Sequence, residues 1–235
     1  MNKTLIIVPA YNEEESIAAT LRDLLIIKQE RPFIDICVIN DGSKDRTASI
    51  VESFEDVTLV NLPYNLGIGG AVQTGYRYAH QHGYDIAIQF DADGQHNADS
   101  IDALIQPILS GEADMVVGSR FLEKTDYKGA VSRRLGIYYF TLLLRLLTGL
   151  TFTDPTSGYR AINKKIISLF AFDYPKDYPE PEVLIHLTRK GFNIKEITVH
   201  MKARQGGSSS ITPLKSIYYM TKVTLSIVIQ RIVRE

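Results

Sequence analysis

Short apolar runs alternate with longer amphipathic segments along the first half of the chain. The runs are rich in β-branched residues and lie at residues 4–8, 34–39, 57–62, 86–90 and 115–117. Segments with apolar positions at helical spacing follow them, at residues 14–27, 45–54, 70–82 and 100–109. This alternation predicts an α/β fold, in which helices flank a mostly parallel, Rossmann-like sheet joined by right-handed crossovers.

The second half contains two longer apolar stretches, at residues 135–152 and 211–233. Arg145 interrupts the first, and Pro213 and Lys222 interrupt the second, so neither supplies the ~20 consecutive apolar residues of a spanning helix. Tyrosines and basic side chains in both stretches suit the headgroup depth of a bilayer. We therefore predict amphipathic helices at a membrane surface, with packing on the domain or on a second copy of the chain as the alternative.

Composition and charge narrow the setting. With 235 residues, 45% of them hydrophobic, the chain is long enough for a substantial core. We expect one domain over residues 1–210, followed by an amphipathic segment at residues 211–235. The 26 basic and 27 acidic side chains leave a net charge of -1, so no overall field favours nucleic acid as a partner. The single cysteine, Cys37, lies in an apolar run and predicts a buried thiol. The amino terminus lacks a signal-peptide pattern, and both features favour the cytoplasm.

Acidic residues follow several of the predicted strands. Asp41 comes after the second strand, and Asp91 and Asp93 come after the fourth, where the ligand site of an open parallel sheet is expected. Ser43 and Asp45 are interpreted as helix caps, because their side chains accept hydrogen bonds from backbone N–H groups. Two carboxylates one residue apart repel each other unless a cation or solvent balances them. This DxD motif therefore predicts a Mg²⁺ or Mn²⁺ site that also takes substrate phosphates.

Three glycines stand at the start of the helix predicted at residues 70–82. Gly67, Gly69 and Gly70 could let backbone N–H groups approach a phosphate. The segment lacks the Lys-Ser/Thr ending of a P-loop and the GxGxxG spacing of a dinucleotide-binding turn. We therefore interpret these glycines as a helix start with tight packing.

Six segments, in order along the chain, carry a resemblance to a known family. They read PAYNEEE, NDGSKDRT, NLGIGGA, DADGQH, VGSRF and DPTSGYR. Together they resemble glycosyltransferase family 2, in particular the dolichyl- and polyprenyl-phosphate mannosyl- and glucosyltransferases. The resemblance covers residues 5–210. It implies a GT-A fold and a metal-dependent enzyme that transfers a sugar by a single displacement with inversion.

The resemblance also implies roles for individual residues. The positions that hold the nucleobase and ribose of a nucleotide-sugar match Pro9, Tyr11, Glu13 and Asp41. The positions of the metal and diphosphate match Asp91, Asp93, Gln95 and Arg120, with Asp93 counted as catalytic. The acceptor phosphate is assigned to Arg204, with Arg133 as a further candidate. The candidate general base is Asp154, with Glu180 and Glu182 as alternatives.

The function implied by the resemblance is transfer of a hexose to polyprenyl (undecaprenyl) phosphate at the inner face of the cell membrane, for cell-envelope glycan synthesis. UDP-glucose is the favoured donor, with UDP-N-acetylglucosamine and GDP-mannose as alternatives. Ser210 stands where many polyprenyl-phosphate enzymes have a lysine. Two other functions stay open: extension of a surface polysaccharide by a family 2 enzyme, and a non-catalytic module that binds a nucleotide-sugar.

Overall fold

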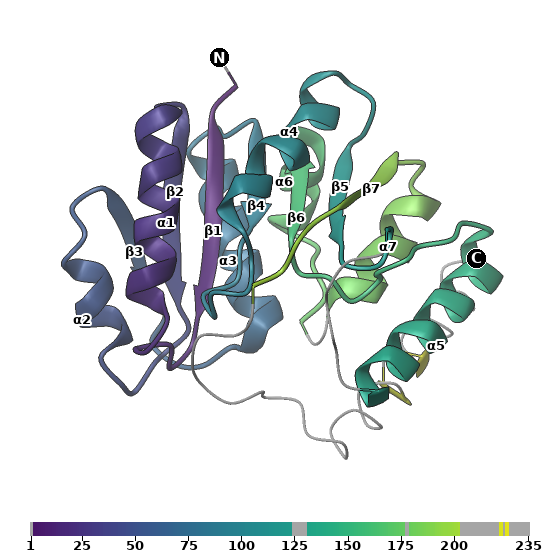
Figure 1. The fold of residues 1–235 in the computed structure, drawn as a ribbon, viewed down its shortest axis with the longest axis horizontal. Helices are drawn as coiled ribbons and strands as arrows, with labels where there is room; N and C mark the ends of the chain where they lie inside the picture. The colour runs from purple at the N-terminus through teal and green to yellow at the C-terminus, as the bar shows by residue number, and fades with distance from the viewer. Residues whose placement is uncertain (1, 124–130, 177–178, 203–220, 223, 226–235) are drawn as a thin grey trace.

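The computed structural model of the chain describes residues 2–123, 131–176, 179–202, 221–222 and 224–225 (Figure 1). Its centre is a seven-stranded sheet with the order β3-β2-β1-β4-β6-β5-β7. The strands are β1 (Thr4–Ala10), β2 (Ile34–Asn40), β3 (Val57–Asn61), β4 (Ile86–Gln89), β5 (Met115–Ser119), β6 (Arg160–Asn163) and β7 (Ile194–Thr198). The helices are α1 (Ile17–Glu30), α2 (Thr47–Glu52), α3 (Gly67–Gln81), α4 (Ile101–Leu109), α5 (Val131–Thr148), α6 (Lys164–Phe170) and α7 (Pro179–Arg189), with a short 3-10 helix η1 (Ala98–Ser100) before α4.

The sheet is mostly parallel, as predicted, and one strand runs against its neighbours. β1 pairs in parallel with β2 and β4, and β5 pairs in parallel with β7. β6 is antiparallel to both β4 and β5. Its first residue, Arg160, lies opposite Gln89 of β4 and Val117 of β5. The turn that leads into β6 therefore reaches the edge of the sheet at which β4 and β5 end.

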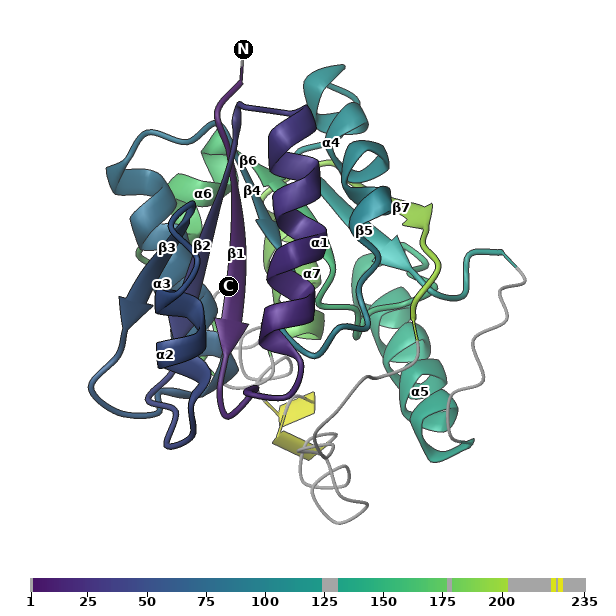
Figure 2. The ribbon, with the colours of Figure 1, turned by 60° about the vertical axis from the view of Figure 1, so that its left-hand side comes forward.

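Helices cover both faces of the sheet and enclose two apolar cores. Along β1, Leu5 and Ile7 belong to one core and Ile6 and Val8 to the other, because successive side chains of a strand point to opposite faces. The first core receives side chains from α3, α5, α6 and α7, and the second from α1, α2 and α4. Figure 2 shows α1 and α3 on opposite sides of β1. The full burial of β1 explains its continuous apolar run.

Element boundaries differ from the predictions where a polar side chain ends or starts a helix. The N-cap of α2 is Arg46, and the carboxylate of Asp45, one residue earlier, accepts the Thr47 N–H of the first turn at 3.0 Å. Ser43, predicted as a helix cap, instead accepts the N–H of Asn12 in the loop after β1, at 3.0 Å. α7 starts at Pro179, since proline suits the first helical position. Cys37 is buried in β2, as predicted.

The apolar stretch at residues 135–152 forms most of α5, and one of its faces packs on the domain. Phe140 and Leu144 are fully buried in the first core. Tyr138, Leu142 and Leu146 repeat every fourth residue on the exposed side of the helix. Among the described residues, no helix is both long and apolar enough to cross a bilayer. Most of the segment predicted at residues 211–235 lies outside the described residues; within it, Thr224 meets Tyr139 through a 2.8 Å hydroxyl contact.

Candidate functional site

The loops after β1 and β2 are tied together at the carboxyl ends of the strands. The N–H of Glu13 donates to the Thr47 hydroxyl at 2.8 Å, and the N–H of Lys44 donates to the Asn12 side chain at 2.8 Å. Behind them, the Thr20 hydroxyl donates to the carbonyl of Ala92 at 3.1 Å. These bonds join the segments that carry PAYNEEE, NDGSKDRT and DADGQH into one site.

In the predicted nucleotide pocket, Asp41 already binds the start of α3. Its Oδ1 accepts the N–H of Leu66 at 2.7 Å and its Oδ2 accepts the N–H of Gly67 at 2.9 Å. Burial raises the pKa of Asp41, and these two N–H groups oppose part of that rise. A carboxylate thus caps the helix where a phosphate cradle was the alternative.

The remaining residues of that pocket differ in exposure. Tyr11 is exposed, Pro9 is buried in β1, and Glu13 is half-buried and accepts the Ser16 hydroxyl at 2.7 Å. Gly69 lets the chain before α7 approach α3: an added Cβ would lie 2.1 Å from the carbonyl oxygen of Lys176. The predicted tight packing of the glycine segment is therefore confirmed.

The DxD loop follows β4 directly and carries half-buried carboxylates. The side chain of Asp91 is 37% exposed, and its contacts are long, at 3.5 Å to Gln89 Nε2 and 3.4 Å to His96 Nε2. Asp93 Oδ1 accepts the N–H of Gln95 at 3.0 Å. The Gln95 carbonyl accepts the N–H of Lys202 at 2.8 Å, which links this loop to the chain after β7.

His96, which the sequence did not single out, holds the DxD loop from inside the protein. Its Nδ1 accepts the N–H of Asp91 at 2.9 Å, so the ring proton belongs on Nε2, which faces Asp91 Oδ2. Burial lowers the pKa of His96, against the opposing charge of Asp91. The ring stacks on Tyr159 at 4.4 Å and meets Phe90 edge-on at 5.2 Å. The motif DADGQH contained this histidine, but nothing in its spacing revealed the partner 63 residues further on.

The donor set of the DxD loop fits a hard divalent cation that shares its coordination shell with a ligand. Gly158 leaves room beside the loop, because an added Cβ would lie 3.2 Å from Asp91 Oδ2 and 2.9 Å from Gln89 Nε2. Within the described part of the chain, no three His, Cys, Asp or Glu side chains cluster as a complete metal cage. Mg²⁺ typically binds through one or two carboxylates and substrate phosphates, which matches two aspartates that are both partly exposed.

Arg120 and Asp154 form a buried ion pair at the same edge. Arg120 Nε donates to Asp154 Oδ2 at 2.6 Å, and its Nη2 donates to Oδ1 at 2.7 Å. The Asp154 side chain is 0% exposed, and it also accepts the Arg120 N–H at 3.2 Å. Thr156 accepts a further bond from Arg120 Nη2 at 3.0 Å. Both carboxylate oxygens of the predicted base are therefore engaged with Arg120 inside the protein.

A second buried arginine supports the start of α7. Arg160 donates to the carbonyls of Ser157 at 2.6 Å and Glu180 at 2.9 Å. Burial raises the pKa of Glu180, while Arg160 opposes the rise and the charge of Asp91 adds to it. Glu180 is half-buried, and its neighbour Glu182 is buried. Glu180 is thus within electrostatic reach of Asp91 in the DxD loop.

Two predicted acceptor residues cannot be placed. Arg204 lies outside the described residues, and so does the side chain of Arg133, whose backbone belongs to the first turn of α5.

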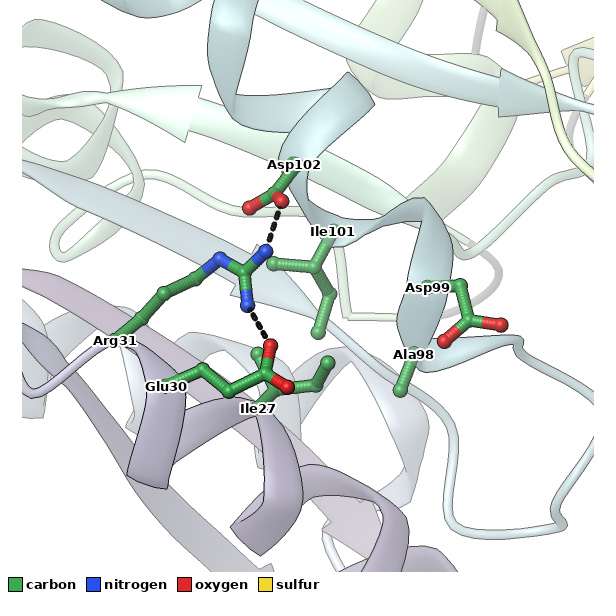
Figure 3. A pocket seen from close by; sticks show the side chains of 7 residues that line it. All are labelled: Ile27, Glu30, Arg31, Ala98, Asp99, Ile101 and Asp102. Atoms are coloured by element: carbon green, nitrogen blue, oxygen red, sulfur yellow. Dashed lines mark hydrogen bonds and ion pairs between the residues drawn. The ribbon is translucent and has the colours of Figure 1, made fainter.

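A hollow of about 210 Å³ lies between the end of α1 and the start of α4. Figure 3 shows Arg31 there, bonded to Glu30 and Asp102. None of its lining residues belongs to the predicted site.

Comparisons with known proteins agree with this architecture. The family model "Glycosyl transferase family 2" matches residues 5–170. The UDP-N-acetylglucosamine--dolichyl-phosphate N-acetylglucosaminyltransferase of Methanococcus voltae is 32% identical over 83% of this chain and 83% of its own length. The undecaprenyl-phosphate mannosyltransferase of Micrococcus luteus is 30% identical over 89% of this chain and 88% of its own length.

A solved structure shares the fold. Glucosyl-3-phosphoglycerate synthase from Mycobacterium tuberculosis, crystallised with Mn²⁺, UDP and phosphoglyceric acid, superposes with a TM-score of 0.73 over 98% of this chain and 78% of the synthase. Its sequence identity is 19%, so the likeness concerns the fold, and the predicted GT-A-like architecture is confirmed. From the family model and the relatives together, the chain belongs to glycosyl transferase family 2.

Proposed function

We propose that this chain transfers a hexose from a nucleotide-sugar, with UDP-glucose favoured, to polyprenyl phosphate such as undecaprenyl phosphate. The observation that carries the proposal is the acceptor common to its relatives. Dolichyl phosphate and undecaprenyl phosphate appear in the names of proteins that match 83% and 89% of the chain, whereas the sugars in those names differ. A polyprenyl phosphate is therefore the best-supported acceptor, and the donor has to be measured. The product would serve cell-envelope glycan synthesis.

The donor half of the reaction would use the strand ends. Asp91 and Asp93, with Gln95, would hold Mg²⁺ or Mn²⁺, and the bound cation would neutralise the leaving nucleoside diphosphate. Arg120 would meet the diphosphate through its planar guanidinium group, which suits phosphate oxygens. The nucleoside would lie against Pro9, Tyr11, Glu13 and Asp41. The two oxygens of Asp41 would then bind both the base and the start of α3.

The acceptor half needs little proton transfer. A lipid phosphate is already ionised near neutral pH, so its oxygen attacks the anomeric carbon without a strong base. Attack from the face opposite the nucleoside diphosphate would invert the anomeric configuration. We therefore propose that Asp154 orients Arg120, and that Glu180 is the better candidate for a carboxylate that contacts substrate. Positioning and charge neutralisation would supply most of the rate.

Peripheral docking at the inner face of the membrane would bring the lipid phosphate to this edge of the sheet. Tyr138, Leu142 and Leu146 on α5 are 70%, 47% and 72% exposed. Apolar side chains that form a stripe on one face of a helix bury favourably among lipid headgroups and acyl chains. Phe140 and Leu144, on the opposite face of α5, are buried in the first core. Binding of the exposed stripe to the bilayer would therefore hold the whole domain at the membrane surface.

A donor screen tests the proposal. Purified protein is incubated with Mn²⁺ or Mg²⁺, a short-chain polyprenyl phosphate, and UDP-glucose, UDP-N-acetylglucosamine or GDP-mannose in turn. Release of UDP or GDP together with one glycolipid is the expected result. Turnover with a glycan acceptor alone would favour polysaccharide extension, and nucleotide binding without turnover would favour a binding module. Either of these outcomes would overturn the proposed acceptor.

A further inference from the structure

Glu196, in β7, carries a carboxylate that is bonded to the turn before β6. Its Oε1 accepts the N–H of Asp154 at 2.9 Å and that of Thr153 at 3.0 Å. Its Oε2 accepts the same Thr153 N–H at 2.8 Å and the Thr153 hydroxyl at 3.1 Å. Burial raises the pKa of Glu196, and the N–H groups of Thr153 and Asp154 oppose that rise. One carboxylate thus fixes two successive peptide units.

Two routes lead from this turn to Arg120. Through side chains, the fixed Asp154 binds Arg120 Nε and Nη2 at 2.6 Å and 2.7 Å. The second route passes through Ser119, whose hydroxyl contacts the Thr153 hydroxyl at 2.6 Å. The same Ser119 hydroxyl accepts the backbone N–H of Phe121 at 3.1 Å. Both residues that flank Arg120 in sequence are therefore tied to the turn that Glu196 holds.

We propose that Glu196 is a positioning residue for the transfer reaction. Glu196 holds the backbone of Thr153 and Asp154, and so fixes the orientation of the Asp154 carboxylate. Because Arg120 donates to both oxygens of that carboxylate, its guanidinium group is oriented as well. The inference rests on the proposed function to the extent that Arg120 meets the donor diphosphate. The charge and the two oxygens of Glu196 both matter, because its oxygens accept bonds from three donor groups.

The substitution Glu196→Gln keeps the size of the side chain and tests this role. The Thr153 N–H now bonds both carboxylate oxygens, at 3.0 Å and 2.8 Å. In either orientation the amide would therefore turn its N–H₂ group toward that N–H and place two donors against each other. Glu112→Gln is the matched control, since Glu112 pairs with Lys195 at 2.6 Å on the exposed surface beside the same strand. Thermal melting would establish that each variant is folded, and Glu196→Asp, which keeps the charge, would replace Glu196→Gln if the latter does not fold.

Two readouts separate positioning from a general structural effect. The first is the ¹⁵N–¹H signal of Arg120 Nε, assigned by its loss in Arg120→Lys, which we expect Glu196→Gln to shift and Glu112→Gln to leave in place. The second is binding of UDP and of GDP, each with Mn²⁺, measured by calorimetry. We expect Glu196→Gln to weaken nucleotide binding on the order of tenfold. In an Arg120→Ala background, Glu196→Gln should cause no further loss of nucleotide affinity.

The outcomes distinguish this inference from the proposed function. An unchanged Arg120 Nε signal in folded Glu196→Gln overturns the positioning role, and so do equal losses of nucleotide affinity with and without Arg120. If the unmodified chain binds neither UDP nor GDP, the donor half of the proposed function falls, while the Arg120 Nε signal still decides whether Glu196 positions that side chain.

Discussion

Two aspartates at the same edge of the sheet are held in opposite ways. Asp91 is 37% exposed, and its contacts to Gln89 and His96 are 3.5 Å and 3.4 Å long. Asp154 is 0% exposed and binds Arg120 at 2.6 Å and 2.7 Å. The first carboxylate can turn toward a ligand at little cost, whereas the second is committed to a partner inside the protein. Exposure and bond length, which a motif does not carry, separate ligand binding from positioning.

The largest expected effect comes from breaking the buried ion pair between Asp154 and Arg120. Asp154→Asn leaves Arg120 buried without its counter-charge, and removal of one partner from a buried pair typically costs about 3–5 kcal/mol. Urea unfolding of the variant should show a loss of that order. A free energy of unfolding within about 0.5 kcal/mol of the unmodified chain, as for an ordinary surface substitution, would mean that the pair contributes little.

A substitution in the partly exposed DxD loop should have the reverse effect, with a large loss of activity and a small loss of stability. Asp93→Ala removes one carboxylate of the proposed cation site, so metal-dependent donor turnover should fall on the order of a hundredfold or more. Stability should change by less than about 1 kcal/mol, because half-buried loop positions contribute little to folding. Turnover assays across a Mn²⁺ titration, paired with urea unfolding, measure both. Full activity would remove Asp93 from the site.

A smaller effect is expected at His96, a buried side chain that bonds the partly exposed DxD loop. His96→Phe keeps the ring stacked on Tyr159 but removes the acceptor of the Asp91 N–H. Partners that orient metal-binding side chains typically contribute about 10–100-fold to metal affinity, so Mn²⁺ binding, followed by electron paramagnetic resonance with UDP present, should weaken at least about tenfold. His82→Gln, an exposed change at the end of α3, is the control. Equal Mn²⁺ affinity in the unmodified chain and His96→Phe would leave the histidine a core residue only.

The smallest effect concerns Asp41, whose carboxylate bonds the start of α3 within the proposed nucleotide pocket. Burial raises its pKa, so the folded chain binds this proton more tightly than the unfolded chain. The stability linked to that proton is fully present below the unfolded pKa of about 3.9, and it is lost as the pH rises through the folded value. Relative to Asp41→Asn, the unmodified chain should lose stability as the pH rises above about 4, as tested by urea unfolding at each pH. A difference that is constant or grows in the other direction contradicts the assignment.

The apolar pattern predicted the first five strands and the four helices that follow the first four strands. β1, β2, β4 and β5 are almost entirely buried, and the partly exposed β3 still has an apolar run bounded by turn residues. β6 was not predicted, since its four residues form a strand only through antiparallel pairing with β4 and β5. The motifs identified Asp91, Arg120 and Asp154 as candidate site residues, and the strand pattern placed Asp91 just after a strand. They could not reveal that Arg120 and Asp154, 34 residues apart, bind each other.

Glu196 shows a second limit of sequence reasoning. It lies between Lys195, which is exposed, and Ile197, and none of the six motif segments includes it. Its role depends on the Thr153–Asp154 backbone, more than 40 residues away along the chain. Bonds from a side chain to a distant backbone leave no periodic pattern, and only the folded arrangement identifies them.

The reversed direction of β6 divides the site between two parts of the chain that can change separately. The segments that we propose to bind the nucleoside follow β1 and β2, while Asp154 and Gly158 lie on the turn before β6. A change in the length of that turn would displace Asp154 and Gly158 together and leave β1 and β2 in register. Under the proposed function, a change in that turn would move the partner of Arg120 and the backbone beside Asp91, and would leave the segments proposed to bind the nucleoside in place.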